Sequence, residues 1–342
     1  MKRSRRVTAA LLALLAATAL VGASCTSAPP GTTITLYNGQ HEQTTDALVT
    51  AFERASGIHV AVRSDDEDVL ANQIISEGSA SPADVLYTEN SPALETLQAK
   101  RLLAPLPEAI LAAVSSRDNS PAGDWVGVTA RVSVLIYNTR LLSPDQLPRS
   151  VMGLADPRWK GKLAIAQGET DFQPVVASIA RTYGATAASR WLDAIKANAE
   201  DNVYPDNETI TAQVNAGRAA IGIINSYYWY RERAEIGASN LHSAIASFAP
   251  GDPGTVLDVS GAGVLASSTH KAAAERFVAF LVSRQGQEII AHSDSFEYPI
   301  GSGVQTARDL VPFTSLRPAP LTIAELGTGA TAIALLQKAG LA

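Results

Sequence analysis

The sequence predicts an α/β protein of two lobes that are joined by a hinge and enclose a cleft. Strands and helices alternate between residues 33 and 99, which is typical of an open sheet with helical crossovers. Two extended runs, 126–138 and 255–266, are longer than most strands and suit crossings between lobes. A strand followed by a capped helix at 219–234 places polar and aromatic side chains where such sheets bind ligands.

The first 24 residues have the pattern of a secretory signal peptide. Four basic residues precede an uncharged run of 16 residues, Val7–Gly22, which is short for a membrane span. Cys25, the only cysteine, follows directly, so segment 25–32 is predicted to be a lipidated cysteine and a tether. Gly22 stands where lipoproteins usually have Leu, and a secreted protein with an incidental thiol is the alternative. Both alternatives predict an extracytoplasmic protein. A lipid on Cys25 would anchor it to the outer face of the cell membrane or in the periplasm.

The composition narrows the possible partners. Without residues 1–24 the chain holds 23 basic and 33 acidic residues, a net charge of −10. An acidic surface disfavours nucleic acid as a partner and is compatible with a cation as ligand. One cysteine allows no internal disulfide, so apolar burial must hold the fold, and the length is sufficient for that.

The first lobe is predicted from residues 33–133 and 258–308. Ile34 and Leu36 alternate with polar residues in the first strand, and the following helix carries apolar residues at helical spacing until Gly57 ends it. A proline in the first turn opens the third helix. The predicted strands are 33–38, 58–62 and 83–87, and the predicted helices are 41–55, 69–76, one from 91, 271–282 and 285–291.

The second lobe is predicted from residues 134–257 and 309–342. Its strands are short apolar runs, and its helices end at glycines or carry one apolar face. The predicted strands are 163–166 and 219–224, and the predicted helices are 172–183, 186–197, 210–216, 227–234 and 321–339, the last interrupted at two glycines.

Polar side chains follow three of these strands. His41 and Glu89 lie at strand ends in the first lobe, and Tyr227 and Tyr228 lie at a strand end in the second. A Tyr-Tyr pair alone is more often packing than function. If the lobes close, however, the imidazole, carboxylate and two phenolates converge as a hard ligand set. A phenol titrates near ~10 in isolation, so phenolates at neutral pH need a strong positive charge such as Fe³⁺.

Three motifs resemble one family. They are Tyr-Asn-Gly-Gln-His at 37–41, Ser-Pro-Ala-Asp-Val-Leu-Tyr-Thr-Glu at 81–89 and Ile-Asn-Ser-Tyr-Tyr-Trp at 224–229. In this order and spacing they are similar to those of the ferric-ion-binding proteins of bacterial ABC importers, which are transferrin-like periplasmic solute-binding proteins. The similarity runs from about residue 34 to residue 338.

The resemblance implies a type II periplasmic-binding-protein fold whose interdomain cleft binds Fe³⁺ and whose partner is an ABC-importer permease. It implies that His41, Glu89, Tyr227 and Tyr228 are the metal ligands. It also places Asn207 and Asn225 along the site, near a bound anion. We expect a monomer that captures ferric iron or a ferric chelate and contacts the membrane only through its lipid anchor.

The chain departs from the family at the loop that holds a synergistic anion. Where many members have small neutral residues, this sequence has Glu169, Thr170, Asp171 and Phe172. Two carboxylates would repel a phosphate. One hypothesis is that Glu169 or Asp171 binds the iron directly. The other is that both are solvated acids at a helix start, and that water or carbonate completes the site.

Two alternatives to iron transport remain open from the sequence. The same scaffold would bind an organic cation, thiamine or a polyamine, if Trp229 and Tyr227 formed a cation–π box with nearby acids. A metal-dependent extracellular hydrolase would need a general base, for which Glu169 is the candidate. The sequence contains no Gly-x-Ser-x-Gly, His-Glu-x-x-His or P-loop motif, so we expect a binding protein and not an enzyme.

Overall fold

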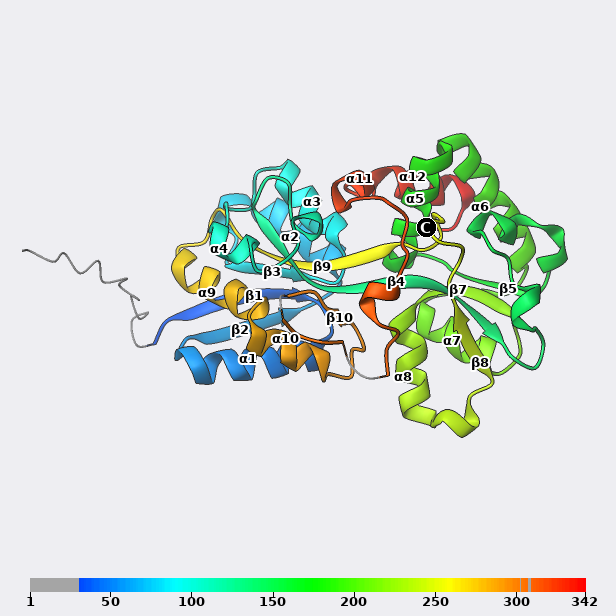
Figure 1. Cartoon of the computed structure of the whole chain (residues 1–342). Coiled ribbons are helices and arrows are strands. Elements are labelled where there is room, and N and C mark those ends of the chain that lie inside the picture. Colours follow the sequence, from blue (N-terminus) through cyan, green and yellow to red (C-terminus); the bar gives the residue numbers. More distant parts are fainter. Residues whose placement is uncertain (1–30, 302, 307–308) are drawn as a thin grey trace, which may run out of the picture.

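The computed structural model describes residues 31–301, 303–306 and 309–342. Two α/β lobes lie side by side and share one mixed sheet (Figure 1). The predicted signal peptide and Cys25 lie outside the described residues. Within the described part of the chain, every helix is too short or too polar to cross a membrane.

The sheet runs continuously from one lobe to the other in the order β2-β1-β3-β9-β4-β7-β5-β6, with β8 and β10 also paired to β4. The first lobe contains β1, β2 and β3, and the second contains β5, β6 and β7 (Figure 1). The strands are β1 (Thr33–Gly39), β2 (His59–Ser64), β3 (Val85–Thr88), β4 (Trp125–Asn138), β5 (Leu163–Ala166), β6 (Val203–Tyr204), β7 (Ile221–Asn225), β8 (Ser243–Ala246), β9 (Leu257–Val264) and β10 (Tyr298–Pro299).

Helices cover the sheet in both lobes. In the first lobe these are α1 (Glu42–Ser56), α2 (Glu67–Glu77), α3 (Ser91–Ala99), α4 (Glu108–Leu111), α9 (Lys271–Leu281) and α10 (Arg284–Ala291). In the second lobe they are α5 (Gln173–Tyr183), α6 (Ala185–Ala199), α7 (Asn207–Asn215), α8 (Ser226–Ile236) and α12 (Ala330–Ala339), while α11 (Ile323–Leu326) lies between the lobes. A short 3₁₀ turn, η6 (Thr170–Phe172), leads into α5.

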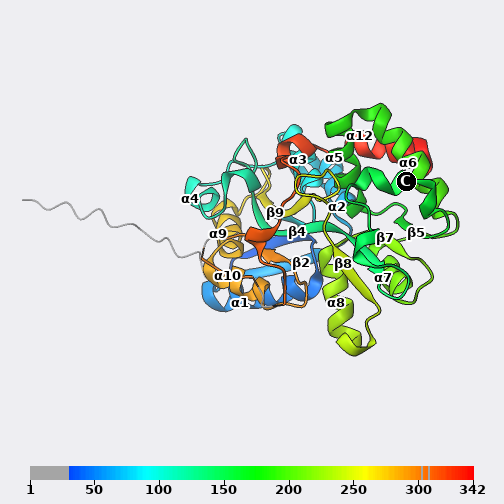
Figure 2. The ribbon, with the colours of Figure 1, turned by 45° about the vertical axis from the view of Figure 1, so that its right-hand side comes forward.

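Strand β4 belongs to both lobes, and all of its residues are buried. Its first part, up to Val132, pairs antiparallel with β9, and from Ser133 onward it pairs with β7. Strand β9 also pairs with β3, so these two long strands carry the chain from lobe to lobe. Figure 2, which is turned from the first view, again shows β4 and β9 between the two groups of helices. The expected crossings at 126–138 and 255–266 are therefore confirmed as long strands.

Each lobe has its own apolar core. Leu48, Phe52 and Phe277 belong to a cluster in the first lobe, and Trp191 and Leu192 belong to one in the second. A third cluster extends along β4 from one lobe into the other. Because each lobe also has a core of its own, it can keep its internal structure while the relative orientation of the lobes changes.

Most predicted elements are present within a few residues of their expected bounds. Short elements went unpredicted, namely α4, β6, β8 and β10, because two to four residues carry too little periodicity to be recognised. The predicted helix 210–216 was placed too late: α7 begins at Asn207, since the side chain of Asp206 accepts a hydrogen bond from the Thr209 N–H at 2.7 Å and caps the helix. The predicted lobe boundaries stay a prediction.

The close approach of β1 to α2 requires a glycine at position 39. A Cβ atom on Gly39 would lie 2.7 Å from the Cβ of Glu67, inside any acceptable contact. The end of β1 therefore runs directly against the start of α2. This contact fixes the positions of Gln40 and His41, the two residues that follow Gly39.

Candidate metal site between the lobes

A cleft of about 750 Å³ lies where the strands of the two lobes end. The first lobe contributes residues 38–43, 64–69 and 89, and the second contributes 168–170 and 205–206. Among the described residues that line it, eight have carboxylate side chains and none is a lysine or an arginine. The cleft therefore attracts cations and repels anions.

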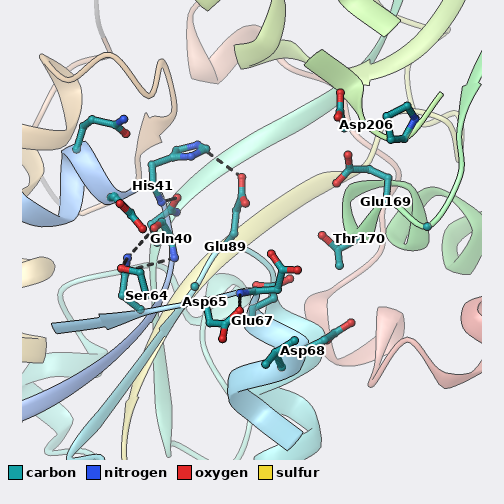
Figure 3. Close-up of a pocket in the computed structure, with 18 residues that line it drawn as sticks. Gln40, His41, Ser64, Asp65, Glu67, Asp68, Glu89, Glu169, Thr170 and Asp206 are labelled. Atoms are coloured by element: carbon teal, nitrogen blue, oxygen red, sulfur yellow. Dashed lines mark hydrogen bonds and ion pairs between the residues drawn. The ribbon is translucent and has the colours of Figure 1, made fainter. Parts of the chain in front are cut away.

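His41 and Glu89 form the first-lobe side of the site. His41 follows β1 and stands at the N-cap of α1, and Glu89 follows β3. The Nε2 atom of His41 lies 3.5 Å from Oε1 of Glu89, and Figure 3 shows the two side chains facing each other. Glu169 lies on the opposite side of the cleft (Figure 3).

The two tyrosines form the second-lobe side. They occupy the first turn of α8, directly after β7, as the strand–helix pattern predicted. The Tyr227 hydroxyl donates to Glu89 Oε1 at 2.8 Å, so the two lobes touch through the site. The Tyr227 and Tyr228 rings stack with centroids 4.1 Å apart, and the His41 ring meets Tyr227 edge-on at 5.1 Å. All four predicted ligands thus lie in one cluster, and their role as ligands stays a prediction.

The loop before α5 supplies two more carboxylates. Asp171 is 3% exposed and lies 3.3 Å from the Tyr227 hydroxyl. Asn207 donates its side-chain amide to Asp171 at 3.3 Å and its backbone N–H to Glu169 at 3.2 Å. The hypothesis of a solvated helix-start acid is therefore wrong for Asp171, which is buried and hydrogen-bonded. Thr170 lines the cleft beside Glu169.

A comparison with known protein families identifies the family of the chain. Residues 80–315 match the family model described as bacterial extracellular solute-binding protein. The chain belongs to the bacterial extracellular solute-binding proteins.

Individual relatives of this solute-binding protein are similar over nearly their full length. The chain is 38% identical over 332 residues to an Fe(3+)-binding periplasmic protein of Serratia marcescens, covering 96% of this chain and 97% of the relative. It is 37% identical over 326 residues to the major ferric iron-binding protein of Neisseria meningitidis, covering 94% and 98%. The crystal structure of iron-bound HitA from Pseudomonas aeruginosa superposes with a TM-score of 0.85 at 41% identity, covering 91% of this chain and all of HitA. The predicted family and the type II binding-protein fold are confirmed.

Burial controls the acid–base chemistry of the site. It raises the pKa of Tyr227 and Tyr228 well above the usual phenol value, and the negative charges of Asp171 and Glu89 raise both pKa values further. Burial also raises the pKa of Glu89, which the nearby Arg131 guanidinium opposes. The pKa of Glu169 is raised to about 8, first by burial and then by repulsion from Asp171. Without a cation the tyrosines are neutral phenols, and Glu169 is largely protonated at neutral pH.

Sequence reasoning missed the residue at the centre of the site, Arg131. It lies on β4 and is fully buried, with Nη1 3.0 Å from Glu297 Oε1 and Nη2 3.3 Å from Asp171 Oδ1. Its signal was present in the sequence: Arg131 is the only charged residue in the apolar run 125–138. A buried charge needs opposite charges around it, so a single Arg in a buried strand points to hidden carboxylates.

Glu297 was also missed, and no pattern in the sequence identifies it. Ligand atoms of His41, Glu89 and Glu297 lie within 4.8 Å of one another. The Glu297 carboxylate, however, already accepts hydrogen bonds from Arg131, from Gln40 at 3.2 Å and from Thr129 at 3.1 Å. It serves as a fixed anion beneath the site more than as a free ligand.

Asn225, expected along the site, precedes the two tyrosines by two and three residues and is not among the residues that line the cleft. It is buried at the N-cap of α8, but its side chain makes no capping bond. It faces Asp258 of β9, whose pKa burial raises well above the usual value while Arg131 and the Asn225 amide oppose that rise. Asn225 therefore interacts with one of the buried acids near Arg131, and its role beside a bound anion stays a prediction.

The aromatic box expected for an organic cation does not form. Trp229 is not among the residues that line the cleft, and the guanidinium of Arg233 lies 5.8 Å from its ring centroid. Tyr227 is fully buried between Tyr228 and His41. The Tyr227 ring is therefore closed to a bound organic cation, and Trp229 does not join it in a box facing the cleft, which the cation–π alternative requires.

Proposed function

We propose that this protein is an extracytoplasmic carrier that captures Fe³⁺ between its lobes and delivers it to an ABC importer. One observation carries the proposal. Tyr227 from the second lobe and His41 from the first both contact Glu89, at 2.8 and 3.5 Å, in a cleft lined by carboxylates. The naming of the Serratia and Neisseria relatives as ferric binders supports the same metal.

In this proposal His41, Glu89, Tyr227 and Tyr228 bind the ferric ion. Glu89 and two phenolates carry three negative charges, which balance Fe³⁺. The tyrosines hold their protons in the cation-free state, because their pKa values are raised by burial and by Asp171 and Glu89. A trivalent cation reverses that preference, so iron binding releases protons from the site.

We propose that Glu169, and not a phosphate, completes the coordination. Glu169 lies in the cleft wall, and among the described lining residues there is no lysine or arginine to hold an anion. The Arg131 guanidinium, which lies close to the site, is already surrounded by Glu297, Asp171 and Asn90. Carbonate or water in place of Glu169 is the alternative, and the effect of added phosphate on affinity separates these possibilities.

Capture would proceed by closure of the lobes about β4 and β9. We propose that 33–133 with 258–308 moves as one body and 134–257 with 309–342 as the other. Binding residues on both lobes make the closed form the one that holds iron, so an importer permease can distinguish loaded from empty carrier. We further propose a monomer anchored through lipid on Cys25, with no other membrane contact and no enzymatic activity.

The test is a titration of the purified mature chain, residues 26–342, with ferric citrate after removal of bound metal. Phenolate-to-Fe³⁺ charge transfer gives a broad visible band. We expect the band to grow until about one equivalent of iron is bound, as a single site requires. Absence of the band would show that the tyrosines do not bind iron and would overturn the proposal.

A further inference from the structure

Arg131 occupies an unusual position for a charged side chain. It is 0% exposed and lies on β4, two residues before Ser133, where this strand changes partner from β9 to β7. Burying a guanidinium costs several kcal/mol unless opposite charges and hydrogen bonds compensate. A cation at this place also repels an incoming ferric ion. A positive charge beside a proposed cation site needs a specific explanation.

The contacts of the guanidinium provide that explanation, because they reach both lobes. From the first lobe, Asn90 accepts a hydrogen bond from Nη2 at 2.6 Å, and Glu89 Oε1 lies 3.9 Å from the same nitrogen. From the second lobe, Asp171 Oδ1 lies 3.3 Å from Nη2. One nitrogen thus faces the acids that flank the proposed iron position from either side.

The partners of Arg131 are themselves held in place. Asn90, the neighbour of Glu89, donates its backbone N–H and its side-chain amide to Glu67 at 2.7 and 2.9 Å. Glu297 is held by Gln40 and Thr129. The planar guanidinium therefore lies in a rigid frame, and a flexible ammonium would not match its several acceptors.

We propose that Arg131 is a positioning residue for the metal site, which holds Asp171 directly, and Glu89 through Asn90, in the arrangement that a ferric ion meets. This inference rests on the proposed function. Without Arg131 the carboxylates of Glu89, Asp171 and Glu297 repel one another, and they turn away from their common centre. The repulsion between Arg131 and the ferric ion is the cost of having the ligands arranged before iron arrives.

The experiment compares wild type with Arg131→Lys and with the double variant Arg131→Met/Glu297→Gln. The double variant removes both members of the 3.0 Å ion pair, so that Glu297 is not left as an unpaired buried charge. Asp171 loses its contact with Arg131 but keeps hydrogen bonds from Asn90, Asn207 and Tyr227. Arg284→Met is the matched control, because it removes an arginine from an exposed ion pair with Glu288. Circular dichroism and thermal melting verify folding, and ferric titration against a competing chelator gives the affinity and the position of the visible band.

We expect the double variant to lose about 10- to 100-fold in iron affinity although no proposed ligand is removed, as is typical of residues that orient ligands. Its band should persist with a shifted maximum, since the tyrosines remain but their surroundings change. Arg131→Lys should fall between wild type and the double variant, and Arg284→Met should match wild type.

A folded double variant with wild-type affinity and an unshifted band would overturn the inference and leave the proposed function intact. A loss of affinity in Arg131→Lys as well as in the double variant would support the inference, because lysine keeps the positive charge and lacks only the guanidinium geometry. A wild-type protein that gives no band would overturn the proposed function and this inference with it.

Discussion

Two groups of acids near the cleft have different surroundings. Asp171 and Glu297, beneath the proposed ligands, form its floor, and Asp65 and Asp66, which line it, form its mouth. On the floor, Asp171 and Glu297 are 3% and 1% exposed, and each has several fixed donors. At the mouth, Asp65 and Asp66 are exposed, and neither forms an ion pair within the described part of the chain. The floor acids are held in one geometry, whereas the mouth acids are hydrated and act mainly through their field.

This difference indicates which residues matter for binding. A buried group whose direction is fixed can distinguish one cation from another, whereas an exposed group raises the local concentration of every cation. The contribution of each acid to ferric affinity therefore depends on its burial and fixed orientation, and not only on its presence along the cleft. The following substitutions test this dependence from the floor outward.

The largest effect is expected from Tyr227→Phe/Tyr228→Phe. Removal of both hydroxyls eliminates the phenolate charge and should lower ferric affinity by more than about 100-fold, beyond the loss usual for an orienting residue. The visible band should disappear. Tyr183→Phe, at a tyrosine 50% exposed on α5, is the control and should behave as wild type. A persistent band in the double variant would mean that the tyrosines are packing residues.

Glu169→Gln tests a carboxylate of the cleft wall, which is more buried than the mouth acids and less buried than the floor acids. If Glu169 is a ligand, the substitution should reduce affinity about 10- to 100-fold. It should also make binding sensitive to added phosphate, since an anion can then take the vacated position. Isothermal titration with and without phosphate measures both effects, and Glu108→Gln in α4 is the control. Strong phosphate dependence in the wild type would contradict direct binding by Glu169.

The pH dependence of stability tests the same residue without iron. The folded-state pKa of Glu169 is about 8, above its ordinary value of 4.5. The folded state therefore binds this proton more tightly, so Glu169 contributes stability below pH 4.5 that is lost as pH rises toward 8. Between pH 5 and 8 the melting temperature of wild type should fall about 2–5 °C more than that of Glu169→Gln. Parallel melting curves for the two proteins would show that Glu169 is an ordinary surface acid.

The smallest effect is expected at the mouth. Asp65→Asn removes one exposed charge and should change ferric affinity by less than about 2-fold, mostly through the association rate and only at low salt. Stopped-flow binding at two ionic strengths measures the change in association rate. Asp145→Asn is the control, because Asp145 is exposed and does not line the cleft. If Asp65→Asn lost as much ferric affinity as Glu169→Gln, exposed and buried acids would contribute alike, and the proposed difference between mouth and floor would be wrong.

The same distinction explains what could be predicted from the sequence. His41, Glu89, Tyr227 and Tyr228 each follow a strand with clear periodicity, so local pattern places them at strand ends and the family motifs join them. The fold follows from the same alternation. Asp171 and Glu169 were identified because they stand where the family has small residues.

The support beneath the ligands could not be predicted in this way. Gln40 and Glu297 are 257 residues apart, and no local pattern encodes their contact. Arg131 was missed although it is a lone charge in an apolar run, and its partners come from three distant segments. Short strands such as β10, which brings Glu297 to β4, are defined by pairing and not by their own composition.

The chain enters the second lobe through β4 and returns to the first through β9, so part of the first lobe is synthesised after most of the second. The nascent chain contains His41, Glu89 and Tyr227 before the ribosome has added β9, Glu297 or α12. Until then β3 lacks a neighbour on one side, and Arg131 lacks its partner Glu297. A half-synthesised chain therefore has the proposed ligands but not the frame that aligns them. Metal binding should therefore require the complete chain, and a chain truncated before β9 would not sequester metal.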